Sequence, residues 1–361
     1  MRYYIKEIYE SGEYQQTASV KARDDIEYIL EQDNWKKIEI IRARDDADKN
    51  VARRVTMHFK AKASWSKTLA SLKQNDVLLI QFPVRYHTVF LSSVIRSIRK
   101  RGVKVLVIIH DLDMLRYAIS PNKTMTKTLR INMEEKSVLN ECSGIIVHNN
   151  SMKKFLANMG ISEKKMISLE IFDYILDENI EGASGEDKDA PVIIAGNLDR
   201  KKAEYVYSLP DNVDFNLYGI HYDNTPGGNI KYFGSFPPDE LVNVMEGAFG
   251  LIWDGPSIDT CQGTYGEYLK INNPHKTSLY LACGIPVAIW KNAALAEFVK
   301  KNNCGVLIDS ISSIEDIQKN MTDEEYRILR ENCRALAVKL RKGDFTKAAI
   351  SRFLKRYKGK V

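Results

Sequence analysis

The chain has 361 residues, of which 44% are hydrophobic and 28% charged, the balance of an ordinary soluble protein. A chain of this length normally folds as two domains with separate cores. The net charge of +6 is too small for a dedicated nucleic-acid binder. No apolar run approaches the roughly 20 residues of a membrane span, and the first residues do not form a signal-sequence pattern, so we expect a cytoplasmic protein.

Cysteines and local charge add two further expectations. The five cysteines lie far apart without a CxxC pair, which predicts neither a zinc site nor a disulfide framework. Basic residues gather at 96–104 and again at 355–360. These groups either rest on anionic lipid headgroups at the inner membrane face or form ordinary solvated helix faces. The sequence leaves that choice open, and it leaves the oligomeric state open as well.

Short apolar runs rich in β-branched residues alternate with helix-like segments, which predicts an α/β fold with parallel sheets. The runs lack polar alternation, as expected of strands that are covered on both faces. The predicted strands are 1–9, 77–82, 103–109, 144–148, 192–195, 215–218, 249–253, 286–289 and 306–308. The predicted helices are 89–101, 126–141, 241–246, 293–301 and 323–340.

A polar, acidic segment at 177–190 is typical of an interdomain linker. We therefore predict an N-terminal domain of residues 1–176 and a C-terminal domain of residues 191–343, each with a Rossmann-like sheet. The remaining residues, 344–361, form a basic helix that either continues the second domain or packs back on the first.

Ligands of open parallel sheets bind beyond the carboxyl ends of the strands. In the C-terminal domain, the residues that follow the strands are Gly196, Asn197, Arg200, Gly219 and Asp254. Glycine lets backbone amides approach a phosphate, and an arginine can neutralise it. The pattern indicates a phosphate site, although a plain glycine turn before a charged helix start would give the same residues.

A second anion signal lies in residues 268–286. Pro274 favours a turn, after which Lys276, Thr277 and Ser278 occupy the first turn of a helix that ends at Gly284. Free amides, the helix dipole and a lysine together favour a diphosphate at such a place. The GxGxxG and GxxxxGK[ST] motifs are absent, which argues against dehydrogenases and NTPases.

The N-terminal domain offers candidates for proton transfer. The strand at 103–109 delivers His110 and Asp111 to the carboxyl edge of the sheet, where either could act as the general base for a sugar hydroxyl. The alternative is a helix-capping aspartate beside a structural histidine. A metal-binding pair of Asp111 and Asp113 is disfavoured, because it lies in the domain opposite the phosphate signals.

A weaker candidate is the glycine loop after the first strand. Gly12 lies in this loop, and Thr17 and Lys21 lie in the helix that follows. We predict that they approach the acceptor or the reacting sugar.

Four blocks of the sequence carry a family resemblance: IIHDLDMLR, IFDYIL, AGNLDRKK and FGLIWDGPSIDTCQGTYGEYLKINNPHKTSLYLACGIPVAIW. In these blocks the chain resembles the bacterial β-1,6-galactofuranosyltransferases of O-antigen and capsule assembly. It resembles more distantly the glucosyltransferase that extends O-linked N-acetylglucosamine on serine-rich streptococcal adhesins. Both resemblances imply the GT-B fold, in which two Rossmann-like domains face each other across a cleft.

The resemblance implies a UDP-sugar donor held mostly by the C-terminal domain, an acceptor held by the N-terminal domain, and no obligatory metal or other cofactor. The positions that match the shared motifs are Asn197, Arg200, Asp254 and Lys276, with His110 and Asp111 across the cleft. The glutamate that usually grips the ribose in such enzymes is not evident, so the ribose contact stays open.

The predicted function is the inverting transfer of galactofuranose from UDP-galactofuranose to a lipid-linked glycan, in O-antigen or capsular polysaccharide assembly. Lys276 and Arg200 stabilise the departing UDP, and His110 or Asp111 takes the proton of the acceptor hydroxyl. One alternative is a UDP-glucose-dependent glucosyltransferase acting on a glycan or glycoprotein. Another is a non-catalytic GT-B partner subunit, against which the presence of Lys276, Arg200 and Asp111 together argues.

Overall fold

The computed structural model describes residues 1–9, 18–42, 51–84, 89–119, 124, 125, 129, 131–176 and 187–358. These residues divide into two compact units. Unit 1 draws its described residues from Met1–Gln15, Ile26–Leu169 and Lys347–Val361, and unit 2 from Gln16–Asp25 and Glu170–Thr346. Residues 18–25, which the sequence prediction counted with the N-terminal domain, belong to unit 2. They do so because Lys21 and Asp25 bond to the backbone of Ile175.

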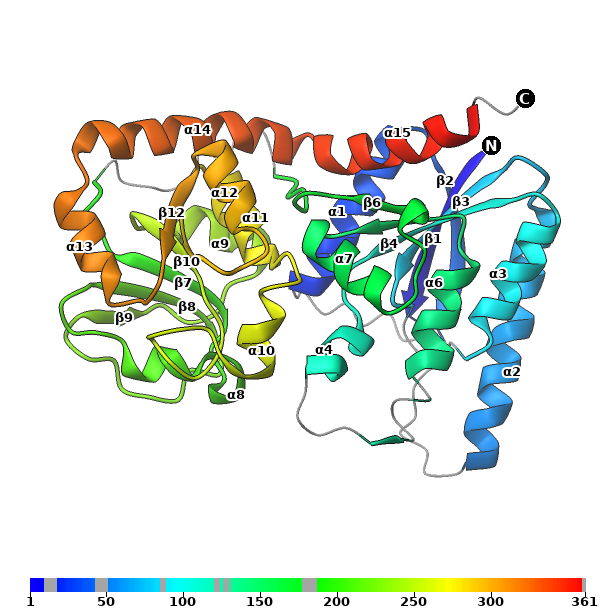
Figure 1. Ribbon diagram of the computed structural model, residues 1–361, viewed down its shortest axis with the longest axis horizontal. Coiled ribbons are helices and arrows are strands. Elements are labelled where there is room, and N and C mark those ends of the chain that lie inside the picture. The colour runs from blue at the N-terminus through cyan, green and yellow to red at the C-terminus, as the bar shows by residue number, and fades with distance from the viewer. Residues whose placement is uncertain are drawn as a thin grey trace. The chain divides into compact units, whose positions relative to one another are not determined.

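Unit 1 is built on a six-stranded parallel sheet with the order β2-β1-β3-β4-β5-β6 (Figure 1). Its strands are β1 (Arg2–Tyr9), β2 (Lys36–Arg42), β3 (Val77–Phe82), β4 (Lys104–Ile109), β5 (Gly144–Val147) and β6 (Met166–Ser168). Every residue of β3 and β5 is buried, as their almost entirely apolar runs predict. The order reverses between β1 and β3, so the carboxyl edge near these strands is the expected ligand side.

The helices of unit 1 connect these strands, and two of them, α1 and α15, also contribute residues to unit 2. They are α1 (Ala18–Gln32), α2 (Val51–Thr68), α3 (Leu91–Lys100), α4 (Asp113–Ile119), α6 (Ser137–Glu141), α7 (Asn150–Asn158) and α15 (Asp344–Lys358), with a π-helical turn η2 (Asn132–Lys136) before α6 and 3-10 turns η1 (Leu69–Ser71) and η3 (Glu163–Lys165). The α2 helix packs against α3 and β2.

Unit 2 has a second six-stranded parallel sheet, with the order β12-β11-β10-β7-β8-β9. Its strands are β7 (Val192–Asn197), β8 (Phe215–Ile220), β9 (Ile230–Tyr232), β10 (Phe249–Ile252), β11 (Val287–Trp290) and β12 (Gly305–Ile308). Read from β9, this is the third, second, first, fourth, fifth and sixth strand of the unit, the dinucleotide-binding arrangement. The order therefore reverses between β7 and β10.

The connections of unit 2 are mostly helical. They are α8 (Arg200–Ala203), η4 (Glu204–Ser208), α9 (Pro238–Val244), α10 (Gly263–Tyr268), α11 (His275–Ala282), α12 (Ala296–Asn302), α13 (Ser313–Asn320) and α14 (Asp323–Arg341). Thr322 caps α14 in a reciprocal capping box with Glu325, as its acidic first turn suggests. None of the helices that the structure describes is long and apolar enough to cross a membrane.

Candidate functional site

Two glycines lie side by side at the carboxyl ends of β7 and β8, where Gly196 pairs with Gly219. Gly219 has a φ of +156°, and a Cβ there would lie 1.7 Å from the carbonyl oxygen of Gly196. A Cβ on Gly196 would instead meet nothing within 4 Å. Gly219 is thus required by the packing of the two strands, while Gly196 leaves backbone open at the edge of the sheet.

Asn197 and the start of α8 follow directly. The Asn197 Oδ1 accepts a hydrogen bond from the Asp199 amide at 3.0 Å and lies 3.1 Å from Nδ1 of His221. His221 has a φ of +65°, which is uncommon for a residue other than glycine. Asp199 itself caps α8 by accepting from the Lys201 amide at 2.9 Å. The amino end of this four-residue helix is therefore occupied by its own cap rather than open to an anion.

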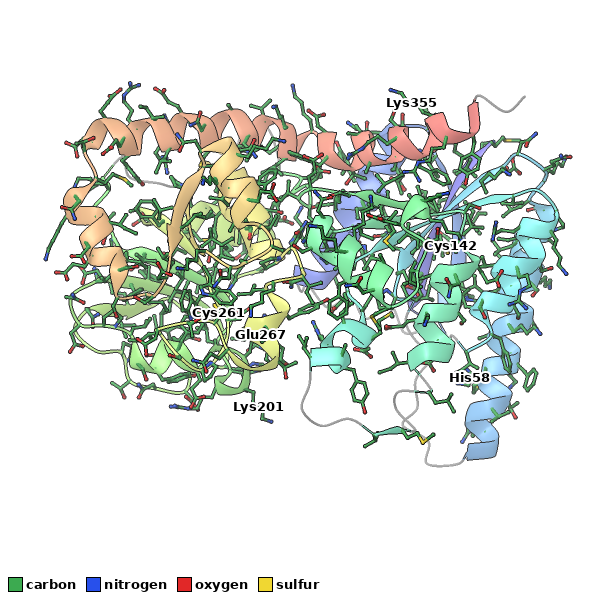
Figure 2. All side chains as sticks on the ribbon, viewed as in Figure 1. His58, Cys142, Lys201, Cys261, Glu267 and Lys355 are labelled. Carbon is green, nitrogen blue, oxygen red and sulfur yellow. The ribbon has the colours of Figure 1, made fainter. Side chains whose placement is uncertain are left out.

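Arg200 is held by neighbours within the unit. Its Nη2 lies 3.2 Å from Asp223 Oδ1 in an exposed ion pair, and its guanidinium lies 3.7 Å from the ring centroid of Tyr207. Because an exposed pair of this kind contributes little stability, a ligand phosphate could displace Asp223 from the arginine. The next residue, Lys201, projects outward from α8 (Figure 2).

Lys276 occupies the first turn of α11, as predicted. Its Nζ donates to the Trp253 carbonyl at 2.7 Å and lies 3.3 Å from Asp254 Oδ1. Burial lowers the pKa of Lys276, and the charge of Asp254 opposes that effect. Asp254 is buried and serves here as the counter-ion of the lysine.

The loops that follow β7 and β10 are tied to each other. The Gly255 amide donates to the Lys202 carbonyl at 2.9 Å, and the Tyr205 amide donates to the Gly255 carbonyl at 3.3 Å. The structure thus brings the segment that begins at Gly196 together with Asp254 and Lys276, at the point where the strand order reverses. Ligands of doubly wound sheets bind at such a point.

The two hydroxyl residues beside Lys276 have different surroundings. Ser278 donates through Oγ to the Phe172 carbonyl at 2.7 Å, so its hydroxyl is used inside the unit. Thr277 is 0% exposed, and its Oγ1 is a buried atom with no hydrogen-bond partner in the described part of the chain. Lys276, Thr277 and the amino end of α11 therefore form the candidate anion site, where the Thr277 amide donates to the Pro274 carbonyl at 3.0 Å and Ser278 serves as an anchor.

His275, the first residue of α11, was not singled out by the sequence. Its ring centroid lies 5.1 Å from that of Tyr174 and 6.0 Å from that of Phe172. Burial, aided by the charge of Lys21, lowers the pKa of His275 to about 3, so its ring is neutral at physiological pH. Its Nε2 is buried with no partner among the described residues.

Of the three residues predicted to approach the acceptor or the reacting sugar, the structure describes only Lys21. Gly12 and Thr17 lie outside the described residues. Lys21 belongs to unit 2, where its Nζ donates to Asp25 Oδ1 at 2.6 Å and to the Ile175 carbonyl at 2.7 Å. It lies 4.9 Å from the ring centroid of Tyr174. These contacts hold the amino end of α1 to residues 174 and 175.

In unit 1, His110 follows β4 at the carboxyl edge of the sheet. Its Nε2 lies 2.6 Å from Oε1 of Gln81, a buried side chain in β3. The Gln81 Nε2 in turn donates to Glu27 Oε1 at 3.5 Å, and Glu27 pairs with Lys6 at 2.7 Å. Gln81 was missed by the sequence analysis, although a polar residue inside the run VLLIQF is a signal that could have found it.

Asp111 lies at the start of α4. One carboxylate oxygen accepts from the Leu112 amide at 2.8 Å, and the other pairs with Arg116. Glu135, also missed, accepts from the amides of Asp113 and Met114 at 3.0 and 2.8 Å, and burial raises the pKa of Glu135 to about 7. Glu135, and not Asp111, therefore accepts from the first amides of α4, so the helix-capping role that the sequence left open for Asp111 is not the one seen here.

No group of three or more histidine, cysteine, aspartate and glutamate side chains in the described part of the chain is placed to hold a metal ion. All five cysteines are buried free thiols, and Cys142 and Cys261 are labelled in Figure 2.

Two family models match the chain, "Glucosyltransferase 3-like, N-terminal domain" over residues 2–171 and "Glucosyltransferase 3-like, C-terminal domain" over residues 192–353. The beta-1,6-galactofuranosyltransferase WbbI of Escherichia coli K12 is 37% identical over 282 residues, which cover 78% of this chain and 79% of that protein. The chain belongs to the glucosyltransferase 3-like family. Glucosyltransferase 3 of Streptococcus gordonii is 25% identical over 78% of this chain and 80% of its own.

The solved structures similar to this family member share its fold at low identity. HepE of Anabaena, solved in complex with UDP, has a TM-score of 0.58 at 12% identity and covers 98% of this chain and 100% of its own. The lipopolysaccharide outer core galactosyltransferase WaaB has a TM-score of 0.56 at 10% identity, with coverage of 98% and 100%. The predicted resemblance and the GT-B fold with two Rossmann-like domains are confirmed. The predicted enzyme class is confirmed as well: the chain is a glycosyltransferase.

Proposed function

We propose that this enzyme transfers galactofuranose from UDP-galactofuranose to a glycan acceptor. The higher identity to WbbI, 37% against 25% for glucosyltransferase 3, supports galactofuranose as the sugar. The proposed binding of UDP rests on the position of Lys276. It stands partly buried at the amino end of α11, beside the point of unit 2 where the strand order reverses.

The diphosphate of the donor binds the first amides of α11 and the Lys276 ammonium in this proposal. The helix dipole and the lysine add there, and the partial burial of the site strengthens both. Arg200 joins them by exchanging Asp223 for a phosphate oxygen. These cations take over the charge stabilisation that a divalent metal supplies elsewhere, so we expect no obligatory metal.

For proton transfer we favour His110 over Asp111. Both oxygens of Asp111 are engaged, one by Arg116 and one by the Leu112 amide, so neither faces an acceptor hydroxyl unless a contact breaks. The His110 imidazole takes the proton of the acceptor hydroxyl as that oxygen bonds to the anomeric carbon. The bond from the anomeric carbon to UDP breaks on the opposite face, which inverts the anomeric centre.

We propose a lipid-linked glycan as the acceptor, in the assembly of O-antigen or capsular polysaccharide at the inner membrane face. A second candidate function is glucosyl transfer from UDP-glucose to a glycan or glycoprotein. It is favoured by the two glucosyltransferase 3-like models, which match residues 2–171 and 192–353.

A donor comparison tests this proposal. Purified protein is incubated with UDP-galactofuranose or UDP-glucose, each with simple glucoside and N-acetylglucosamine acceptors, with and without a chelator. We expect β-linked galactofuranosyl product from the first donor only, at a rate that the chelator leaves unchanged. Product from UDP-glucose alone would favour the second candidate, and loss of activity on chelation would contradict the metal-free mechanism.

A further inference from the structure

The α2 helix and the turn after it form a stretch that carries basic residues and no acidic ones. Residues 51–75 contain six lysines and arginines and no aspartate or glutamate, although acidic residues number 47 in the 361. The basic residues are Arg53, Arg54, Lys60, Lys62, Lys67 and Lys73. Such a stretch attracts an anionic partner.

One face of α2 is packed and the other is exposed. The packed face includes the buried Trp65 and lies against α3 and β2. The exposed face carries Val55, Phe59 and Ala63 at intervals of four residues, with Val55 47% and Phe59 53% exposed. In Figure 1, α2 runs along the outer edge of unit 1 and one end extends past the strands.

Cations flank this apolar stripe on both sides. At 100° per residue, Lys60 and Lys67 lie along one edge of the stripe and Lys62 along the other. The Phe59 ring rests on Phe90 with 4.7 Å between centroids, and Lys62 Nζ lies 5.4 Å from the Phe90 centroid. Among the residues that the structure describes, no carboxylate forms an ion pair with these three lysines.

The basic groups at 96–104 and 355–360, which the sequence suggested as lipid-binding candidates, include arginines that bond within unit 1. Arg96 pairs with Glu141, and Arg101 donates to the carbonyls of Leu69 and Ala70. Arg356 donates to the carbonyls of Lys164 and Met166. These guanidinium groups hold segments of unit 1 together, whereas the lysines of α2 make no such bonds to the part of the chain that the structure describes.

We propose that the exposed face of α2 binds an anionic membrane surface. An apolar stripe with an exposed phenylalanine between rows of lysines is the pattern of a helix that lies in the headgroup region. Val55 and Phe59 enter the boundary between headgroups and acyl chains, and the lysines bind the anionic headgroups. An acidic protein or a nucleic acid would use the lysines but gain little from the stripe. The inference is independent of which sugar the enzyme transfers.

Vesicle sedimentation of the full chain tests this surface. Vesicles of phosphatidylcholine alone are compared with vesicles that also contain phosphatidylglycerol. We expect the wild-type chain to bind only the second kind. We also expect Val55→Ser/Phe59→Ser and Lys60→Glu/Lys67→Glu each to lower the partition coefficient by about ten-fold or more.

Matched changes on unit 2 serve as controls. Ile328→Ser/Val338→Ser removes two exposed apolar side chains from α14, and Lys300→Glu/Lys301→Glu reverses two exposed charges on α12. Both control variants should bind vesicles as the wild type does. All variants should keep the wild-type melting temperature and the wild-type rate with a water-soluble acceptor, which separates loss of membrane binding from damage to the transfer site.

Three results would overturn the proposal. The first is a wild-type chain that ignores phosphatidylglycerol. The second is an α2 variant pair that binds like the controls. The third is binding that depends on the lysines but not on Val55 and Phe59, which would assign the surface to an acidic macromolecule instead.

Discussion

At the scale of single residues, Gln81 explains how His110 is held. A buried amide must find partners, and Gln81 finds one on each side. Because its Nε2 faces the Glu27 carboxylate, its Oε1 is the atom that faces His110 Nε2 at 2.6 Å. An oxygen acceptor there requires a proton on Nε2, which leaves Nδ1 as the proton-accepting nitrogen of the neutral ring.

The pair Gln81→Leu and Gln81→Glu tests this positioning role. Leucine keeps the volume but removes the acceptor, so we expect kcat to fall by about ten-fold or more with a smaller change in KM. Glutamate restores an acceptor and adds a charge that favours the imidazolium. The acid limb of its pH–rate profile should therefore move to higher pH. Wild-type profiles for both variants would show that Gln81 does not act on the base.

At the scale of elements, the anion site depends on how α11 sits on the sheet of unit 2. Tyr280 of α11 accepts a hydrogen bond from the Ala195 amide of β7 at 2.8 Å. Its ring lies directly over Gly250 of β10, where a Cβ would come within 2.2 Å of the ring carbons. The absence of a side chain at Gly250 thus lets one tyrosine join α11 to both strands that flank the reversal in strand order.

We expect Gly250→Ala to displace Tyr280 and to destabilise unit 2 by about 1–3 kcal/mol, the usual cost of overpacking a core. UDP binding should weaken with it, because α11 carries Lys276. Gly228→Ala is the control, since a Cβ at Gly228 would meet nothing within 4 Å. Chemical denaturation and UDP titration give the two readouts. Equal stability of the two variants would contradict the packing argument.

At the scale of the whole molecule, the sequence predicts the sheets better than their edges. The apolar runs of the central strands, such as 77–82 and 249–253, appear as β3 and β10 with nearly the predicted bounds. The strands β2, β6 and β9 were not predicted, because β2 is a charged edge strand and the other two have three residues each. Edge strands lack the continuous apolar pattern that marks a buried strand.

The candidate site also has a part that the sequence predicts and a part that it does not. Strand ends and helix starts can be located from the local sequence, so the places of Gly196, Asp254 and Lys276 in the fold were predicted, while their role in binding stays a prediction. The partners that decide how a side chain behaves come from distant parts of the chain. Gln81 beside His110 and Ile175 beside Lys21 are two examples, and no spacing rule predicts such pairs.

Three buried carboxyl groups give the whole chain a pH dependence. Burial raises the pKa of Asp25 to about 6 and those of Glu135 and Asp173 to about 7. The folded state holds these protons more tightly than the unfolded chain, so the stability they contribute is present at acid pH and is lost as the pH rises toward about 7. Below about 6.5 the neutral buried rings of His148 and His275 work in the opposite direction.

A substitution at Asp173 tests the contribution of one of these carboxyl groups to the pH dependence of stability. Its two oxygens accept from the amides of Phe345 and Thr346 at the start of α15, and an asparagine oxygen can keep one of these two bonds. We expect the melting temperature of Asp173→Asn to rise relative to wild type between pH 5 and 7, by the equivalent of at most about 1.4 kcal/mol per pH unit. Asp211→Asn, at an exposed site, is the control. A constant difference across this range would contradict the assignment.

The central claim is that Lys276 and the amino end of α11 hold the diphosphate of a UDP-sugar. Isothermal titration of UDP into wild type and Lys276→Ala tests it most directly, with turnover measured on the same samples. Lys270→Ala is the control, because Lys270 is an exposed lysine of unit 2 paired with Glu267. The account predicts that Lys276→Ala weakens UDP binding and lowers turnover by about ten-fold or more, with the melting transition retained. Wild-type affinity for UDP in Lys276→Ala would contradict it.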